Sequence, residues 1–361
     1  MAITWAPCSC TRRPCKIASR GSPLFSSLRI CYSGFMRKVF SGIRPSGKLH
    51  LGNYLGAIKN WIALQDDPQT EQAIFAVVDY HGITTPFDPK TYYQQVADTV
   101  LDFLAAGVNP EKSLLIRQSR ISEHTELAWI FNTITPVSWL DRLPTYKEQL
   151  AKSPKYNHMG LLDYPVLMAA DILIYKSNLV PVGQDQLPHI DLTNEIGKKF
   201  NHMFGEVFPS VKAYVTEGAK IMSLQEPTAK MSKTGDEGIA LSDSPDEIRN
   251  KIKKAVTDSG SEIKFDENAK PAISNLLAIY SLLSNKPTPE IEGQYGGKTY
   301  VEFKNDLAEV IADFLKPFQE KHRQFAGDLG LVERILTESE EKAKKIAKAN
   351  LKEIKQKIGI D

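Results

Sequence analysis

Between residues 39 and 134, short apolar runs alternate with segments of helical periodicity, and this alternation restricts the fold more than any other feature. The strand-like runs cover residues 39–43, 73–79 and 114–118, and the helical patterns cover residues 51–62, 91–106 and 123–134. Strands separated by helices pair in parallel through right-handed crossovers, so their carboxyl ends lie on one edge. The predicted fold class is α/β, a Rossmann-like parallel sheet with helices on both faces and a ligand at that edge.

An all-helical region is expected after residue 243, where the strand-like patterns fade. Ser244 and Glu247 have the spacing of a capping box, and Pro245 stands at the first helical position, which predicts a helix up to Ala255. Further apolar stripes cover residues 273–283, 303–314 and 332–358, and Pro317 is expected to end the second stripe. We therefore expect a Rossmann-like domain over residues 37–243 and a helical domain over residues 244–361 that packs partly back on it.

The amino-terminal segment differs in composition from the rest of the chain. Residues 1–38 contain seven Lys or Arg and no Asp or Glu, and all four cysteines lie there. A basic, Ser-rich leader without acids is typical of organellar transit peptides, so residues 1–36 are expected to direct import into the mitochondrial matrix or a plastid. A zinc site and a disordered cytosolic extension are the alternatives. Residues 39–361 are slightly acidic, so charge does not indicate nucleic acid, and no apolar run is long enough for a membrane span.

The first candidate site is the turn PSGKLHLGN, from Pro45 to Asn53, between the first strand and the first helix. Backbone N–H groups at such a helix start can bind an anion. Gly52 has no Cβ, so a flat ring can approach its backbone, while His50 and Asn53 place donors on one helical face. A purely structural helix cap is the alternative interpretation.

Two further runs carry chemistry. The polar run KMSKTG, residues 230–235, has two lysines and two hydroxyl residues that can surround a polyphosphate, although a solvated loop has the same composition. The run DYPVLMAAD, residues 163–171, places Tyr164, Met168 and Asp171 on one helical face. An apolar face that ends in a carboxylate suits an aromatic ligand with one N–H or O–H. The alternative is a core helix in which Asp171 pairs internally.

Together these motifs resemble a known family. The His50 turn and the later lysine run resemble the paired HIGH and KMSKS signatures of class I aminoacyl-tRNA synthetases. With the strand at Phe40, the run 163–171 and the run VPVGQDQ at residues 180–186, positions 37–361 are similar to tryptophanyl-tRNA synthetases of the bacterial and organellar type. The resemblance implies ATP-dependent activation of L-tryptophan to the adenylate and its transfer to tRNA(Trp). Tyrosyl-tRNA synthetase and a non-catalytic RNA-binding paralogue are the alternatives.

The resemblance also implies roles for individual residues. The catalytic set would be His50, Asn53, Lys230 and Lys233. The ATP-binding set would be Arg44, Pro45, Ser46, Gly52, Asn53, Gly183, Gln184, Asp185, Ile221, Lys230, Met231, Ser232, Lys233 and Thr234. The tryptophan-binding set would be Phe40, His81, Tyr164, Met168, Asp171, Val180, Val182 and Gln186. Choice of tryptophan over tyrosine would depend on Asp171 as the buried acceptor of the indole N–H, and Asp171→Ala is expected to abolish selective activation while leaving the fold intact.

The family also implies partners and departures. ATP would carry Mg²⁺, with no prosthetic group and no metal held by the protein itself, and the protein would be a homodimer that binds tRNA through its helical domain. Lysines between Lys342 and Lys357 would contact phosphates, and Trp129, Ile130, Phe131 and Trp139 would serve either the dimer contact or the core. The chain departs from the family pattern at Arg44, Gln184, Thr234 and Gln149. Gln149 replaces a second ATP-directed lysine, for which Lys152 or Arg44 could compensate.

Overall fold

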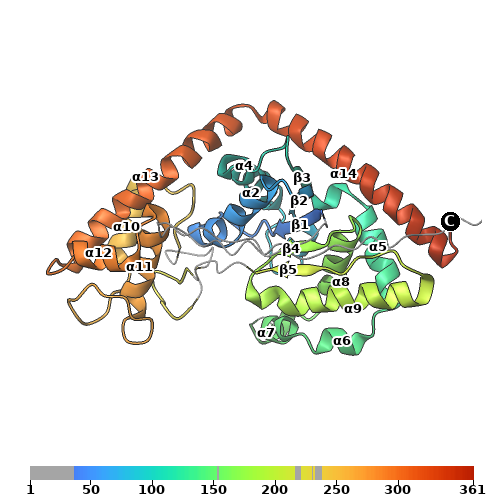
Figure 1. Cartoon of the computed structure of the whole chain (residues 1–361), viewed down its shortest axis with the longest axis horizontal. Helices are drawn as coiled ribbons and strands as arrows, with labels where there is room; N and C mark the ends of the chain where they lie inside the picture. Colours follow the sequence, from blue (N-terminus) through green and yellow to red (C-terminus); the bar gives the residue numbers. More distant parts are fainter. Residues whose placement is uncertain (1–35, 153, 216–220, 230, 232–237) are drawn as a thin grey trace, which may run out of the picture. The chain divides into compact units, whose positions relative to one another are not determined.

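A computed structural model describes residues 36–152, 154–215, 221–229, 231 and 238–361 (Figure 1). The chain divides into two compact units, Met1–Phe35 and Met36–Asp361, and the second contains all the described residues. The expected leader lies outside the described residues. So do four predicted site residues: Lys230, Ser232, Lys233 and Thr234.

A five-stranded, fully parallel sheet lies at the centre of the described unit (Figure 1). Its strands are β1 (Arg37–Ile43), β2 (Thr70–Val77), β3 (Leu114–Arg117), β4 (Leu179–Pro181) and β5 (Lys212–Tyr214). Their order is β3-β2-β1-β4-β5, and every pair is parallel, which confirms the predicted fold class. The chain changes direction across the sheet between β1 and β4, and in sheets of this kind ligands bind at the carboxyl ends beside that point.

Helices cover both faces of this sheet, except for two that pack on other helices. The helices are α1 (Leu51–Asn53), the π-helical η1 (Tyr54–Ile58), α2 (Lys59–Gln65), α3 (Asp79–Gly82), α4 (Tyr92–Ala106), α5 (Glu123–Asn132), α6 (Val137–Asp141), α7 (Pro144–Lys152), α8 (Met159–Leu173) and α9 (Leu187–Phe204). The two that pack on other helices are α6 and α7 (Figure 1). Because side chains alternate along a strand, Val39 and Phe75 pack in the cluster with α2 and α4, whereas Phe40 and Ile74 pack in the cluster with α5, α8 and α9. The sheet thus separates two hydrophobic cores.

The remaining α-helices follow residue 243. They are α10 (Pro245–Lys254), α11 (Pro271–Ser284), α12 (Thr288–Gln294), α13 (Tyr300–Gly327) and α14 (Leu329–Ile358). The capping box at the start of α10 is present as predicted. The expectation that Pro317 ends its helix is wrong, because α13 continues through it to Gly327. Leu315 and Phe318 are both buried on either side of the proline, so tertiary packing holds the helix across the missing hydrogen bond.

Helix α14 lies against the sheet and α5 (Figure 1). Its residues Ala343, Ala347, Leu351 and Ile354 belong to the same hydrophobic cluster as Ile116 of β3. The helical region therefore does pack partly against the sheet, while the predicted boundary at residue 243 stays a prediction. Among the described helices, none has the length and hydrophobicity that a membrane span requires.

Candidate active site at the carboxyl edge of the sheet

The His50 turn is closed by reciprocal hydrogen bonds. The backbone N–H of Asn53 donates to Nδ1 of His50 (3.3 Å), and the backbone N–H of His50 donates to Oδ1 of Asn53 (3.2 Å). Because Nδ1 accepts, the neutral imidazole carries its proton on Nε2, and the NH₂ of Asn53 is its donor group. A Cβ on Gly52 would lie 3.0 Å from Nδ1 of His50, so the flat ring that this glycine accommodates is that of His50 itself.

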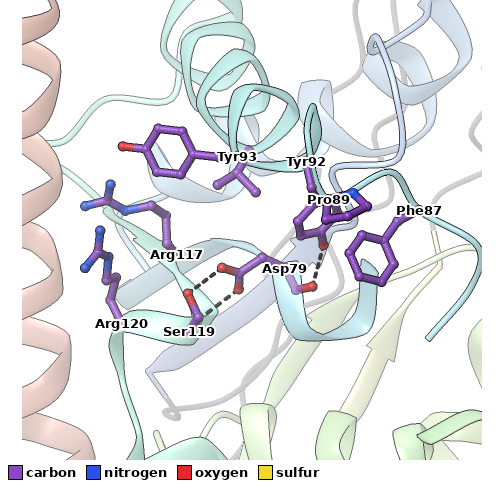
Figure 2. Close-up of a pocket in the computed structure, with 9 residues that line it drawn as sticks. Asp79, Phe87, Pro89, Tyr92, Tyr93, Arg117, Ser119 and Arg120 are labelled. Atoms are coloured by element: carbon purple, nitrogen blue, oxygen red, sulfur yellow. Dashed lines mark hydrogen bonds between the residues drawn. The ribbon is translucent and has the colours of Figure 1, made fainter. Parts of the chain in front are cut away.

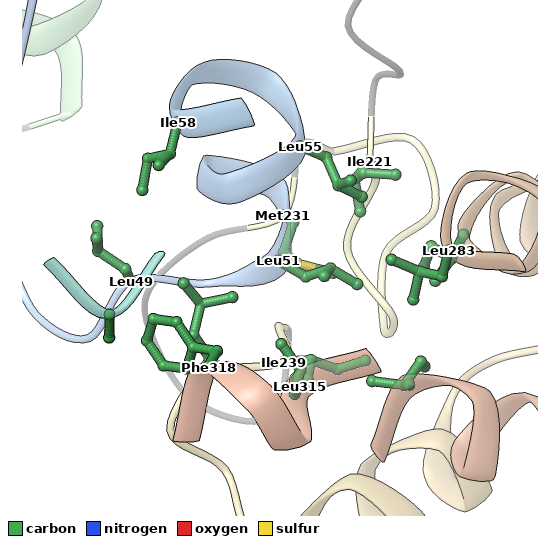
Figure 3. Close-up of a cluster of buried hydrophobic side chains, with 14 of the residues drawn as sticks. Leu49, Leu51, Leu55, Ile58, Ile221, Met231, Ile239, Leu283, Leu315 and Phe318 are labelled. Carbon is green, nitrogen blue, oxygen red and sulfur yellow. The ribbon is translucent and has the colours of Figure 1, made fainter. Parts of the chain in front are cut away.

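The residues that flank the lysine run lie beside this turn. Ile239 accepts from the N–H of Leu51 (2.9 Å), and the N–H of Met231 donates to the carbonyl of Ile221 (3.1 Å). The Cβ of Ile221 lies 3.7 Å from the position that a Cβ on Gly52 would occupy. Ile221 and Met231 are buried in the cluster that Figure 3 shows around Leu51. The structure thus brings Met231 and the flanking residues Ile221 and Ile239 to the start of the first helix.

Asp171 is fully buried on α8 and has three internal partners. Its carboxylate lies 2.6 Å from Nδ1 of His124 and 2.8 Å from Nε2 of His81, and Nε2 of Gln118 lies 2.8 Å from both oxygens. Burial would raise the pKa of Asp171, but the hydrogen bonds from His124 and His81 lower it to about 2. An ionised carboxylate only accepts, so both histidines donate to it. Asp171 therefore has the internal pairing that the sequence left open as the alternative.

Second partners orient these donors. Oε1 of Gln118 accepts from the N–H of Tyr80 (3.1 Å), so its NH₂ group must face Asp171. Nε2 of His124 lies 2.7 Å from the hydroxyl of Tyr175, and burial raises the pKa of that hydroxyl well above its usual value. Tyr175 therefore donates to His124, and His124 donates to Asp171. The network is fixed in one arrangement of donors and acceptors.

The predicted apolar wall residues gather next to this network. Phe40 stacks on Tyr175 with ring centroids 5.8 Å apart, and it belongs to the same buried cluster as Val180. Met168 and Val182 are half-buried against that cluster. These residues come from β1, α8 and the end of β4, so the structure brings β1 together with a segment that lies far from it in the sequence.

Tyr164 has two hydrogen-bond partners within the protein. Its hydroxyl donates to Oγ1 of Thr145 (2.9 Å) and lies 3.0 Å from Nε2 of His189. Burial and, to a smaller extent, the charge of His81 lower the pKa of His189 to about 4 against the opposing effect of Asp185, so this ring is neutral at pH 7. Nδ1 of His189 is buried and has no hydrogen-bond partner among the described residues.

The loops after β1 and β4 complete this edge of the sheet. Arg44 and Ser46 are exposed, whereas Pro45 is buried with its Cδ 3.3 Å from the position of a Cβ on Gly82. Burial raises the pKa of Tyr164, and the charge of Arg44 acts against that rise. After β4, three predicted residues are exposed: Gly183, Gln184 and Asp185. Gln186 is half-buried and donates to Asp185 (2.8 Å).

A separate cavity of about 370 Å³ lies beyond β2 and β3 (Figure 2). It is lined by Asp79, Phe87, Pro89, Tyr92, Tyr93, Val96, Arg117, Ser119 and Arg120, and none of them is a predicted site residue. Inside it, Asp79 accepts from the backbone N–H (2.9 Å) and the hydroxyl (2.5 Å) of Ser119. This contact ties the segment after β3 to α3, which carries His81.

The sequence interpretation missed Gln118, His124, Tyr175 and His189. A signal was present for His124, because it shares one helical face with Leu127 and Phe131, and a polar residue on such a face needs a buried partner. Gln118 directly follows a strand, at the edge where ligands bind. No local pattern distinguishes Tyr175 or His189 from ordinary core residues.

Comparison with known proteins identifies the family. A family model described as tRNA synthetases class I (W and Y) matches residues 36–316. The chain belongs to this synthetase family. A curated relative from Helicobacter pylori (strain ATCC 700392 / 26695), named tryptophan-tRNA ligase, is 43% identical over 328 residues, which cover 90% of this chain and 99% of the relative. A relative of the same name from Gloeobacter violaceus is 40% identical over 90% of this chain and 96% of its own length.

Solved structures of synthetases resemble this one closely. The tryptophanyl-tRNA synthetase of Mycoplasma pneumoniae has a TM-score of 0.81 at 31% identity and covers 91% of this synthetase and 99% of its own chain. That of Campylobacter jejuni, complexed with ADP and tryptophan, has a TM-score of 0.78 at 34% identity, with 89% and 99% covered. A tyrosyl-tRNA synthetase from Aeropyrum pernix, at 21% identity and a TM-score of 0.64, shares the fold alone.

Proposed function

We propose that this synthetase is a tryptophan-tRNA ligase, which activates L-tryptophan with ATP and transfers it to tRNA(Trp). The observation that carries the proposal is 43% identity to a relative of that name over 90% of the chain. The buried Asp171 network and the His50 turn, both at the carboxyl edge of the sheet, support it. This position also favours an active synthetase over the non-catalytic paralogue that the sequence left open.

The activation step requires position and charge. The tryptophan carboxylate attacks the α-phosphorus of MgATP, pyrophosphate leaves, and a mixed anhydride forms. The attacking carboxylate is already ionised at pH 7, so no general base is needed. Nε2–H of His50, the NH₂ of Asn53 and the lysines of residues 230–233 would stabilise the phosphate charge of the transition state. Removal of one such donor costs about 3 kcal/mol, about 100-fold in rate.

Selection of tryptophan would use the Asp171 network. Of the three donors to Asp171, His81 alone keeps some solvent exposure, at 7%, whereas Gln118 and His124 have none. His81 is therefore the donor that an incoming indole N–H would replace at Oδ2. A phenol ring of tyrosine has no donor at that position of the ring, so it would displace His81 without replacing its hydrogen bond.

The decisive experiment is amino-acid-dependent exchange of pyrophosphate into ATP. With residues 36–361, we expect exchange with tryptophan and at least about 100-fold less with tyrosine. Exchange with tyrosine alone would favour a tyrosyl-tRNA synthetase. No exchange with either amino acid would favour the RNA-binding paralogue.

The helical region is proposed to bind tRNA. Six lysines on α14 are exposed, Lys342, Lys344, Lys345, Lys348, Lys352 and Lys357, while Lys355 pairs with Glu126 (3.0 Å). Phosphate contacts release counterions, so we expect tRNA(Trp) affinity to fall steeply between about 50 and 200 mM salt. An affinity without this salt dependence would contradict the proposal.

A homodimer is proposed through α5. Trp129 is 71% exposed there, whereas Ile130 and Phe131 are buried core residues, and Trp139 is half-buried beneath the ammonium of Lys199 (5.5 Å). Of the four aromatic and aliphatic candidates, Trp129 is therefore the one available to a partner. We expect Trp129→Glu to convert a dimer to a monomer in sedimentation, and an unchanged dimer would refute this contact.

Import into an organelle is proposed from the leader. Its five basic residues without an acid support a mitochondrial matrix destination, with a plastid as the second choice. We expect residues 1–36 to carry a fluorescent protein into one of these organelles. A cytosolic distribution of the fusion would refute the proposal.

A further inference from the structure

An ion pair joins the last helix of the chain to the open edge of the sheet. β3 is an edge strand, paired only with β2, and its last residue is Arg117. The backbone N–H of Arg117 donates to Oε1 of Glu340 on α14 (3.1 Å). The guanidinium of Arg117 also donates to both carboxylate oxygens of Glu340, through Nε (2.7 Å) and one terminal nitrogen (3.0 Å). Glu340 thus holds both the backbone and the side chain at the end of β3.

This ion pair is shielded from water. The side chains of Arg117 and Glu340 are 8% and 11% exposed, so solvent screens their attraction little. A second acid, Glu333, contacts the same guanidinium (2.9 Å), but its side chain is 57% exposed. Loss of Glu340 would leave the backbone N–H of Arg117 without this acceptor and the guanidinium with only the exposed carboxylate of Glu333.

The residues that follow Arg117 form the support of the tryptophan acceptor. Gln118, the next residue, contacts both oxygens of Asp171 and accepts from Tyr80. Ser119 donates twice to Asp79, as Figure 2 shows. These contacts join the turn after β3 to α3 and to α8. A shift at the end of β3 is therefore transmitted directly to the amide that touches Asp171.

We propose that Glu340 on α14 is a positioning residue for amino-acid selection. Through Arg117 it fixes the turn after β3, and this turn aims the amide of Gln118 at Asp171. The inference rests on the proposed function and deepens it, because it makes the carboxyl-terminal helix part of the indole-recognition apparatus. Glu340 does not touch the substrate, so its effect is on recognition of the indole N–H.

The test compares L-tryptophan with β-(3-benzothienyl)alanine, an analogue in which sulfur replaces the indole N–H. Pyrophosphate exchange on the full chain gives kcat and KM for each substrate. We expect Glu340→Ala to reduce the preference for tryptophan by at least about tenfold, through a higher KM for tryptophan and an almost unchanged KM for the analogue. Glu340→Gln keeps an acceptor for the N–H of Arg117, so it should retain part of the preference.

Lys355→Met is the matched control. Lys355 pairs with Glu126 of α5, so its replacement also removes an ion pair between α14 and a neighbouring helix. This ion pair does not involve Arg117 or Gln118. Its preference for tryptophan should equal that of the wild type. Urea unfolding checks that each variant is folded. If Glu340→Ala does not fold, Glu340→Gln decides the test, and its preference for tryptophan over the analogue should then be lower than that of the wild type.

Three results would overturn the inference. They are a preference in the folded Glu340 variants within twofold of the wild type, an equal loss in Lys355→Met, and an equal fall in kcat/KM for both substrates. Lack of tryptophan exchange in the wild type would instead refute the proposed function. The two failures are therefore distinguishable.

Discussion

Removal of the carboxylate of Asp171 should cost stability as well as activity. In Asp171→Ala, the donors of Gln118 and His124 lose their acceptor inside the protein, where water does not reach them. An unsatisfied buried donor costs about 1–3 kcal/mol, so the two together predict a loss of about 4 kcal/mol in the free energy of unfolding. This is a large share of the roughly 5–15 kcal/mol of a typical domain. The expectation that this substitution leaves the fold intact is therefore revised.

Urea unfolding followed by circular dichroism at pH 7 measures this loss. Asp163→Ala is the matched control, because Asp163 lies on the same helix, is half-buried and accepts one hydrogen bond, from Asn132 (2.9 Å). We expect the control to lose about 1 kcal/mol and to keep its tryptophan-dependent exchange. If Asp171→Ala were no less stable than Asp163→Ala, the network would not hold the core, and the reasoning would be refuted.

Three further predictions concern single sites. The pKa of His189 is lowered from 6.5 to about 4, so between these pH values the unfolded chain binds a proton that the folded chain does not. The free energy of unfolding should therefore fall by up to about 3 kcal/mol as the pH drops from 6.5 to 4. His189→Gln should flatten this part of the profile of urea midpoint against pH. Gly52→Ala places a Cβ against the ring of His50, so exchange should slow by about tenfold with an unchanged melting temperature, and normal kinetics would contradict this role. Ser244→Ala removes the cap on the N–H of Glu247 and should cost about 1 kcal/mol in thermal unfolding without a change in exchange.

Local patterns predicted part of the fold, because β1, β2 and β3 were expected as strands and β4 and β5 were not. The alternation of apolar runs and helical stripes indicated parallel strands, and the capping box at Ser244 indicated the start of α10. Both patterns depend on residues that are close together in the chain, so a single sequence is enough to recognise them. The stop at Pro317 failed because the continuation of α13 depends on burial of Leu315 and Phe318 against distant parts of the chain. That burial has no counterpart in the local sequence.

The candidate site was predictable only in part. Helical spacing correctly placed Tyr164, Met168 and Asp171 on one helix, α8. It could not reveal the donors to Asp171, because Gln118 and His124 lie 53 and 47 residues away along the chain. Whether a buried acid pairs internally or awaits a ligand depends on such distant partners. A short motif therefore shows where a site lies, but it does not show whether a buried carboxylate in the site already has hydrogen-bond partners.

The position of α14 has a consequence for synthesis of the protein. The ribosome makes this helix after the described strands of the sheet, yet the helix supplies apolar side chains and a carboxylate that cover β3. Until α14 has been made, the β3 edge of the nascent sheet is uncovered and can pair with other chains. Truncation of the chain before α14 should therefore yield aggregates and not a shortened, working enzyme.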